Sequence, residues 1–486
     1  MEKRKSILLF FNKIYKIYIC IRYVYYMNFL KKILQSVTYF AKNKNYLFNF
    51  FIVSAIIGVG ISYSNLYLFH ILLVIYVFTY LLLYPINKFS ENFLLSKYPT
   101  RLHYIIFFTI IWYSLMLIIT ENKFYGIKYL SFIIIGNIII FIVVQKIKMI
   151  SQLKNLYKTI AIIIIVEIII SLFESVGIFR WPISRLSENV VYFGRVNEIT
   201  TILNESFSNF YVQTMPTGFH WNPNNLAVLM GMAFPFFIFH KNKWISIFGS
   251  IIIIWIVVQC GARLIFLSFY LMIFLSFLII NKKNIIVPFF VTIIIIFCST
   301  NGFSLLNGKL SKFNEIQSFT FGLIGLNQPS FNKNNETSKT GSIALRKELI
   351  IFGINSSIEH YGIGVGGGNS QNELEKIGGI GEKKIMDLHN FWIELLMEGG
   401  IIFLLFFISW YCIILWKLFR IIRICKELML SYLSKSSFVA LSGFIVSAVA
   451  PSSVIYFFPM YILFGFSIST INIYKMNYEN TPSIRY

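Results

Sequence analysis

The residues best suited to chemistry lie in one stretch, Asp387 to Gly400, which reads DLHNFWIELLMEGG. Asn390, Glu394 and Glu398 recur every four residues, so a helix would place them on one face. His389 directly precedes them, and an imidazole titrates near neutral pH, which suits a general base. The pattern indicates a polar helix face beneath a base. A capped helix start with an interfacial histidine explains it equally well.

A second polar cluster, TGFHWNPNNLAVL, runs from Thr217 to Leu229. Asn222 followed by Pro223 is the usual order of an N-cap and a first-turn proline. That ordinary interpretation leaves Asn224 and His220 unexplained. Amides at a helix N-terminus also suit sugar hydroxyls or a diphosphate, so Asn222 and Asn224 are candidates for substrate binding as well as for helix capping.

Two arginines are candidates for anion binding, because a guanidinium holds phosphate in a rigid fork. Arg263 is the only charge between two apolar segments that almost no loop separates, although a lone arginine there can also snorkel. Arg346 lies in SIALRKELIIFGI, Ser342 to Ile354, which has helical periodicity. One prediction is that this helix lies on the membrane surface through its apolar positions, which are Ile343, Leu345, Leu349, Ile350 and Phe352.

Other titratable residues compete for a role. His220 and His360 are predicted to lie on the same side of the membrane as His389 and are alternative bases. Glu167 and Glu174, seven residues apart in one apolar segment, share a helix face. An acid inside a membrane is a functional candidate by default, and a buried partner for Arg263 is an equally good account of these two.

Several familiar sites are excluded. Asp387 is the only aspartate, so the Asp-x-Asp metal clamp of many nucleotide-sugar transferases is absent, as are a P-loop and a zinc spacing. Five cysteines have no paired spacing. The glycine run GIGVGGG, Gly362 to Gly368, lacks the strand and helix of a dinucleotide loop and is predicted to be a flexible connection. We therefore predict neither metal nor cofactor.

The elements that position these residues are predicted to be membrane-spanning helices. The chain is 57% hydrophobic and 13% charged, whereas a soluble domain carries roughly 25% charged residues. The predicted fold is an all-α polytopic membrane protein with about twelve transmembrane helices. The apolar segments are 46–63, 66–84, 103–119, 127–144, 159–176, 218–239, 244–260, 264–280, 285–300, 391–416, 436–450 and 453–473.

The formal charge of +23 fits one orientation of these segments. With both termini cytoplasmic, the inner loops hold 28 of the 43 Lys and Arg residues and four acids, as the positive-inside rule requires. The charge is thus explained by topology and does not indicate nucleic acid. The predicted parts are a basic interfacial segment 1–45, spans one to nine in 46–300, a large extracytoplasmic loop 301–390 with short helices, spans ten to twelve in 391–473 and a cytoplasmic tail 474–486; Met27 is an alternative start to Met1.

These pieces, in this order, resemble the O-antigen ligase and polymerase superfamily of bacterial envelope glycosyltransferases. The resemblance covers about residues 160 to 420 and rests on an Asn-Pro-Asn helix start, an arginine between two closely joined spans, and a long external loop. That loop carries an arginine-bearing helix and a glycine-rich turn, and ends in a His-Asn start that continues to Glu-Gly-Gly. The matching residues here are Asn222–Asn224, Arg263, Arg346, Gly362–Gly366 and His389–Glu398. One departure is Ala262, where the superfamily more often has serine.

The resemblance implies an integral membrane glycosyltransferase that transfers a polyprenyl-diphosphate-linked glycan to an acceptor hydroxyl. Arg263 and Arg346 would bind the diphosphate, and His389 would deprotonate or orient the acceptor. The reaction would be metal-independent and would invert the anomeric centre, on the outer face of the bacterial cytoplasmic membrane. Implied partners are the lipid-linked oligosaccharide, an acceptor glycan or glycolipid, the bilayer, and further a flippase and a chain-length regulator. Supporting or substrate-binding residues would be Asn222, Asn224, Asn390, Glu394 and Glu398.

Alternatives stay open at this stage. A polymerase, which extends a surface polysaccharide, is favoured over a ligase that uses lipid A core, because two sizeable outer segments offer room for two glycans. A lipid-linked oligosaccharide flippase is the rival of another class, with Glu167 as its best support. Against it, no internal repeat relates the two halves. A membrane scaffold is disfavoured by the polar residues gathered at one mouth.

Overall fold

The computed structural model describes residues 44–83, 99–196, 214–279, 288–293, 342–381, 385–451 and 453–479. The predictions for segment 1–45, for Met27, for most of span 285–300, for 301–341 and for most of the tail lie outside these residues. The chain divides into two units. One holds the described residues Lys44–Ser54 and Phe69–Leu83, and the other holds Ala55–Leu68 and everything from Pro99 onward.

Helices make up most of the described structure. A short antiparallel hairpin, β1 (Ser62–Tyr63) and β2 (Leu66–Tyr67), is the one sheet among the described residues. Each predicted apolar segment that is described over its length contains a helix. The helices are α2 (Lys44–Ile57), α3 (Leu68–Leu83), α5 (Ile105–Ile119), α6 (Lys123–Lys146), α7 (Ile150–Val176), α10 (Pro223–Ile238), α11 (Lys243–Gln259), α12 (Arg263–Ile279), α15 (Ser342–Glu359), α16 (Asn369–Lys376), α17 (Phe391–Ile424), α18 (Leu428–Ser447) and α19 (Phe458–Tyr474).

Ten of these helices are candidates for membrane-spanning segments or parts of them. Within the described ranges, five are long and apolar enough to cross a bilayer, and five more are apolar and 10 to 17 residues long. The protein is therefore a mostly helical, multi-pass membrane protein, and the count of twelve spans stays a prediction. The five long ones are Leu102–Ile119, Lys123–Lys146, Ile150–Val176, Phe391–Ile424 and Leu428–Ser447.

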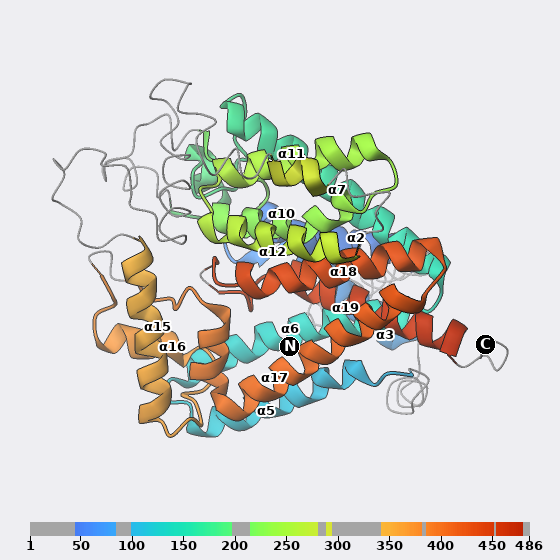
Figure 1. The fold of residues 1–486 in the computed structure, drawn as a ribbon. Coiled ribbons are helices and arrows are strands. Elements are labelled where there is room, and N and C mark those ends of the chain that lie inside the picture. Colours follow the sequence, from blue (N-terminus) through green and yellow to red (C-terminus); the bar gives the residue numbers. More distant parts are fainter. Residues whose placement is uncertain are drawn as a thin grey trace, which may run out of the picture. The chain divides into compact units, whose positions relative to one another are not determined.

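Helix α19 forms the centre of the larger unit. Every residue from Phe458 to Tyr474 is buried, including the polar residues Ser467, Ser469, Thr470 and Asn472. It packs against α6, α7, α17 and α18, while α18 also packs against α10 and α12 (Figure 1). The ends of these helices carry the polar residues singled out in the sequence.

Two helices of the segment predicted to be extracytoplasmic, α15 and α16, lie beside the first turns of α17 (Figure 1). They share a small core with α17, in which Leu349, Leu374 and Met397 are fully buried. The prediction that the apolar side of α15 lies on the membrane surface is thus wrong. Leu345, Leu349 and Phe352 pack against protein, because the start of α17 and its preceding segment offer a nearer apolar surface.

The glycine run is not a flexible connection, contrary to the prediction. Helix α17 is interrupted at Gly400, whose φ of 80° and ψ of 172° are not helical, and this exposes backbone groups to the run. The N–H of Gly366 donates to the Glu398 carbonyl (3.1 Å), and the N–H of Ile401 donates to the Gly362 carbonyl (2.9 Å). A Cβ on Gly364 would lie 2.7 Å from the Gly400 nitrogen, so glycine is needed for the close approach of two backbones.

Candidate active site

Asn390 caps helix α17. Its amide oxygen accepts hydrogen bonds from the N–H groups of Trp392 (3.1 Å) and Ile393 (3.4 Å). These donors belong to the first turn, where the helix itself supplies no acceptor. The capped helix start predicted for this position is confirmed, and it fixes the direction in which the preceding residue leaves the helix.

That preceding residue is His389, which has a φ of 50°. Residues other than glycine seldom adopt this left-handed conformation, and such outliers concentrate at functional sites. The Nδ1 atom is buried and has no hydrogen-bond partner among the described residues. Burial, and next the positive charge of Arg346, lower the pKa of His389 to about 4, although the adjacent Pro451 carbonyl opposes the shift. The imidazole is therefore neutral at pH 7.

Arg346 reaches from α15 to the segment that follows α18. Its Nη1 donates to the Val449 carbonyl (2.7 Å) and its Nη2 to the Ala450 carbonyl (3.3 Å). A guanidinium has five N–H groups, so three have no partner within the described structure. Burial, and next the positive charge of Arg263, lower the pKa of Arg346 from its usual value. The two arginines are thus close enough to repel each other.

Arg263 is the first residue of α12 and is half-buried. The turn before it is as tight as the sequence suggested: α11 ends at Gln259, and Gly261 takes a φ of 68°. The N–H of Gly261 donates to the Val258 carbonyl (2.9 Å), which closes the end of α11. This reversal places the guanidinium of Arg263 at the mouth of the two helices.

The segment Ala448–Pro451 connects these elements. Its carbonyls accept from Arg346, lie beside His389, and accept from the N–H of Phe391 at the start of α17 (3.3 Å). Arg346 and His389 therefore meet at a segment that the sequence reasoning missed, and Arg263 lies near enough to Arg346 for their charges to interact. This segment makes its contacts through backbone carbonyls. The only sign of it in the sequence was Pro451, which follows small residues at the end of the predicted span 436–450.

Glu394 and Glu398 form a separate buried network on the predicted face of α17. Glu394 accepts from the hydroxyls of Ser453 (2.8 Å) and Tyr129 (3.3 Å), and Glu398 accepts from Ser370 (2.5 Å). Between them lies a polar cavity of about 20 Å³, which is room for about one water. The carboxylates thus tie α17 to α6 and α16, and these hydroxyl partners were not predicted.

Asn222 caps α10 by accepting from the Asn224 N–H (2.9 Å), with Pro223 in the first turn, as predicted. The segment before it adjoins the Arg263 turn, since Cys260 Sγ lies 3.6 Å from the Pro216 carbonyl oxygen. The Asn-Pro-Asn start and Arg263 therefore lie at the same end of the bundle. Substrate binding by Asn222 and Asn224 stays a prediction.

Glu167 and Glu174 of α7 bind the backbone of residues 217–219, just before the N-cap of α10. Glu174 Oε2 accepts from the N–H groups of Thr217 and Gly218 (2.7 Å each), and Glu167 Oε1 accepts from Phe219 (2.9 Å). The cation beside Glu174 is Arg180, at 3.7 Å. These contacts give both acids a structural role, so the strongest support for a flippase is accounted for in another way.

The three candidate bases occupy different places. His220 Nε2 lies 3.9 Å from Glu167, and its ring packs near Phe457. His360 is an exposed residue just after α15 and contacts the Ser356 carbonyl through Nδ1 (2.8 Å). Fourteen residues of helix separate it from Arg346, about 21 Å at 1.5 Å per residue. His389 is the histidine whose charge state responds to Arg346.

Comparison with known proteins finds a family model that is similar to part of this chain. Residues 248–408 match the family model described as O-antigen ligase. The matched range includes Arg263, Arg346, His389, Glu394 and Glu398. The resemblance to the O-antigen ligase and polymerase superfamily is confirmed.

A curated relative points the same way as the O-antigen ligase match. The teichuronic acid biosynthesis protein TuaE of Bacillus subtilis (strain 168) is 21% identical over 357 residues, which are 72% of this chain and 67% of the relative.

Among the described residues, no three His, Cys, Asp or Glu side chains are arranged to hold a metal ion.

Proposed function

We propose that this protein is a membrane glycosyltransferase that moves a glycan from a polyprenyl diphosphate carrier to an acceptor hydroxyl. The observation that carries the proposal is that Arg346 and His389 meet at residues 449–451, while Arg263 lies near enough to Arg346 for the two charges to repel each other. Two like charges in a partly buried place repel each other, and a bound diphosphate would remove that repulsion. A neutral imidazole beside them can accept a hydroxyl proton.

The diphosphate would bind through the remaining donors of Arg346 together with Arg263. The carbonyls of Val449 and Ala450 fix the plane of the Arg346 guanidinium, so its orientation is set before the substrate arrives. Charge that develops on the leaving diphosphate would then meet preorganised donors, which is the usual source of a large rate effect. In this scheme the arginines serve where other transferases use a divalent cation.

The transfer would proceed in one displacement. The acceptor oxygen attacks the anomeric carbon, the bond from that carbon to the diphosphate oxygen breaks, and the polyprenyl diphosphate leaves with the electron pair. The hydroxyl proton passes to the imidazole of His389. Attack from the face opposite the leaving group inverts the anomeric centre. Asn222, Asn224, Asn390, Glu394 and Glu398 support the site by fixing the helix starts and the position of α17 against its neighbours.

Donor binding would also prepare His389 for its role. The charge of Arg346 contributes to the low pKa of His389 in the unbound protein. A dianionic diphosphate on Arg346 offsets that charge, so the pKa of His389 rises toward the working pH, where a general base is most effective. Proton acceptance is thereby coupled to occupancy of the donor site.

Two further parts of the proposal concern location and product. The basic loops assigned to the inner side support a site on the outer face of the cytoplasmic membrane, where nucleotide sugars are absent and lipid-linked donors are used. The name of the TuaE relative supports a role in building an envelope polysaccharide. We favour a polymerase of repeat units over a ligase to lipid A core or another acceptor. Deletion of the gene distinguishes the two. Cells that keep single repeat units but lose the polysaccharide ladder indicate a polymerase, whereas cells that accumulate lipid-linked polymer indicate a ligase.

The test is glycan transfer by purified protein in proteoliposomes with a lipid-linked donor. His389→Ala is compared with His360→Ala, which removes an exposed histidine on the same external segment. We expect at least tenfold loss for His389→Ala and none for His360→Ala. Equal rates for His389→Ala and the unaltered protein, at equal insertion, would overturn the assignment of the base.

A further inference from the structure

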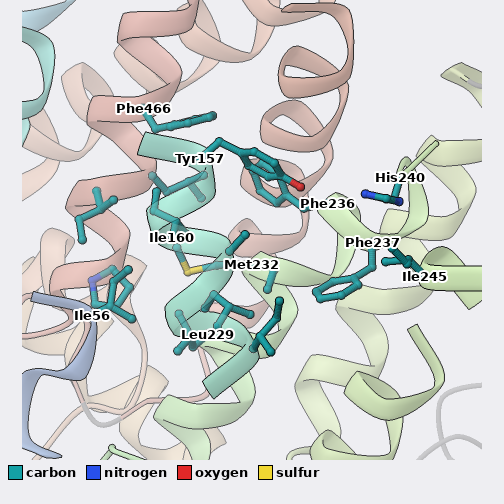
Figure 2. Close-up of a pocket in the computed structure, with 17 residues that line it drawn as sticks. Ile56, Tyr157, Ile160, Leu229, Met232, Phe236, Phe237, His240, Ile245 and Phe466 are labelled. Carbon is teal, nitrogen blue, oxygen red and sulfur yellow. The ribbon is translucent and has the colours of Figure 1, made fainter. Parts of the chain in front are cut away.

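A second site is built into the membrane-spanning part, away from His389. A cavity of about 240 Å³ lies among α7, α10, α19 and the start of α11 (Figure 2). Its lining is almost wholly apolar and includes Ile164, Leu229 and Met232. Tyr157 and His240 supply its side-chain polar groups. None of the arginines or the histidine of the candidate active site lines it.

The polar groups of the cavity lie toward the opposite end of the helices from the active site. Tyr157 precedes Glu174 by 17 residues on α7, and Glu174 holds the segment at the active-site end. At 1.5 Å per residue the separation is about 25 Å, close to the thickness of the hydrocarbon core. His240 likewise follows the far end of α10.

The cavity opens toward lipid on one side. Ile165 and Ile245 both line it, and both are nearly half exposed, at 48% and 46%. In a protein that spans a membrane, exposed apolar side chains of this kind face hydrocarbon. Helices α7 and α11 contact each other at their other ends, where Trp255 Nε1 donates to Ser175 Oγ (3.4 Å). A hydrocarbon chain can therefore enter from the bilayer between Ile165 and Ile245.

The rim near Tyr157 and His240 is cationic. Lys154 precedes Tyr157 by three residues and so continues the face of α7 that lines the cavity. Lys158 follows Tyr157, while Lys241 and Lys243 follow His240, and all four lysines are exposed. The sequences 145–158 and 240–243 contain no acid. The exposed Trp244 is typical of the membrane interface.

We propose that this cavity binds one acyl chain of an anionic phospholipid, whose headgroup phosphate contacts the lysine rim. The chain satisfies the apolar lining, and the phosphate satisfies Lys154, Lys158, Lys241 and Lys243. The tail of the polyprenyl donor would also suit the lining. Its diphosphate, however, is proposed above to bind Arg263 and Arg346, neither of which lines the cavity. The proposal goes beyond glycan transfer, and only its choice of a phospholipid over the polyprenyl donor rests on the proposed function.

The experiment measures phospholipids that stay bound to protein extracted from vesicles of phosphatidylglycerol and phosphatidylcholine, by native mass spectrometry. We expect one retained phosphatidylglycerol per chain, in preference to phosphatidylcholine. The double variant Lys241→Glu and Lys243→Glu should reduce that preference by at least about fivefold per lysine. Its control, Arg423→Glu with Lys426→Glu, alters exposed cations of the α17–α18 turn and should leave the preference unchanged.

A second pair of variants tests the cavity itself. Ala161→Trp fills the lining and should abolish lipid retention, whereas Ile162→Trp, at a neighbouring residue that is 65% exposed, should not. Equal retention of the two phospholipids by the unaltered protein would overturn the proposal. So would retention of an added polyprenyl phosphate in place of phospholipid, with no response to the lysine variant. The charge variant decides the matter even if Ala161→Trp fails to fold.

Discussion

Glu174 on α7 and Arg346 on α15 are both charged groups placed in an apolar protein, yet their hydrogen bonds are used very differently. The carboxylate of Glu174 accepts from the N–H groups of Trp181, Thr217 and Gly218 and lies beside Arg180. Arg346 donates to two backbone carbonyls and keeps three N–H groups for other partners, in the electrostatic reach of a second arginine.

We propose that this difference separates a group that stabilises the fold from a group that binds a ligand. A carboxylate surrounded by donors is satisfied without any substrate, and the backbone segment that it fixes leads directly into α10. A cation that sits beside another cation is destabilised until an anion arrives. The hydrogen-bond partners of the two residues distinguish these roles.

The largest expected effect is on the arginine side of this comparison. Arg346→Ala should lower the rate of glycan transfer about 10²- to 10³-fold, the usual effect of removing one preorganised donor from a developing negative charge. Arg346→Lys should recover only part of the rate, because an ammonium lacks the planar fork. The adjacent exposed Lys347→Ala is the control and should leave the rate unchanged. A fully active Arg346→Ala would remove the distinction drawn above.

Glu174→Gln should have the opposite profile. It weakens charge-assisted hydrogen bonds to buried N–H groups, so the free energy of unfolding should fall by about 1–3 kcal/mol, measured by thermal or denaturant unfolding in detergent. The transfer rate per folded molecule should stay near that of the unaltered protein. Glu188→Gln, at an exposed acid in the segment between α7 and α10, should change neither the stability nor the rate. A loss of rate without a loss of stability would place Glu174 in the chemistry.

A smaller effect concerns pH. His389 acts when neutral, so activity should be lost as pH falls through its pKa, which is about 4 in the unbound protein. The acid limb of kcat/KM should therefore lie near pH 4, and the limb of kcat should lie at a higher pH, because bound diphosphate offsets the charge of Arg346. Coincident limbs in the two pH profiles would argue against that coupling.

The smallest expected effect is that of metal removal. If the arginines alone neutralise the diphosphate, treatment with a chelator should leave the transfer rate unchanged. The measurement is the rate in proteoliposomes before and after chelation, with magnesium restored as a control. A rate that falls and recovers with the divalent ion would show that the arginines are not sufficient.

Much of this arrangement could be predicted from the sequence. The lengths of the apolar segments predicted the helices, and an asparagine before a helix start predicted the caps at Asn222 and Asn390. Both signals are local in the sequence. Arg263 and Arg346 could be identified as candidates because charged residues are rare in such an apolar sequence and a guanidinium suits phosphate binding. The helices α7 and α18 extend beyond the predicted apolar segments because their polar first turns are also helical.

The remaining features depend on contacts between distant residues. The carbonyls of Val449 and Ala450 bind Arg346 through backbone atoms, which every residue carries, so no side-chain pattern marks them. Gly364 looked flexible because a glycine that permits close packing cannot be told from one that permits motion without knowing what it contacts. Tyr129 is 265 residues from Glu394, and nothing local links them.

The central claim is that the arginines bind the donor diphosphate and that His389 acts on the acceptor. Equilibrium binding of a short-chain polyprenyl diphosphate to the purified protein tests it most directly, with Arg263→Ala, Arg346→Ala and His389→Ala compared side by side. The account predicts at least tenfold weaker binding for each arginine variant, the effect of losing one charged contact, and unaltered binding for His389→Ala. Equal binding by all three variants and the unaltered protein would contradict it.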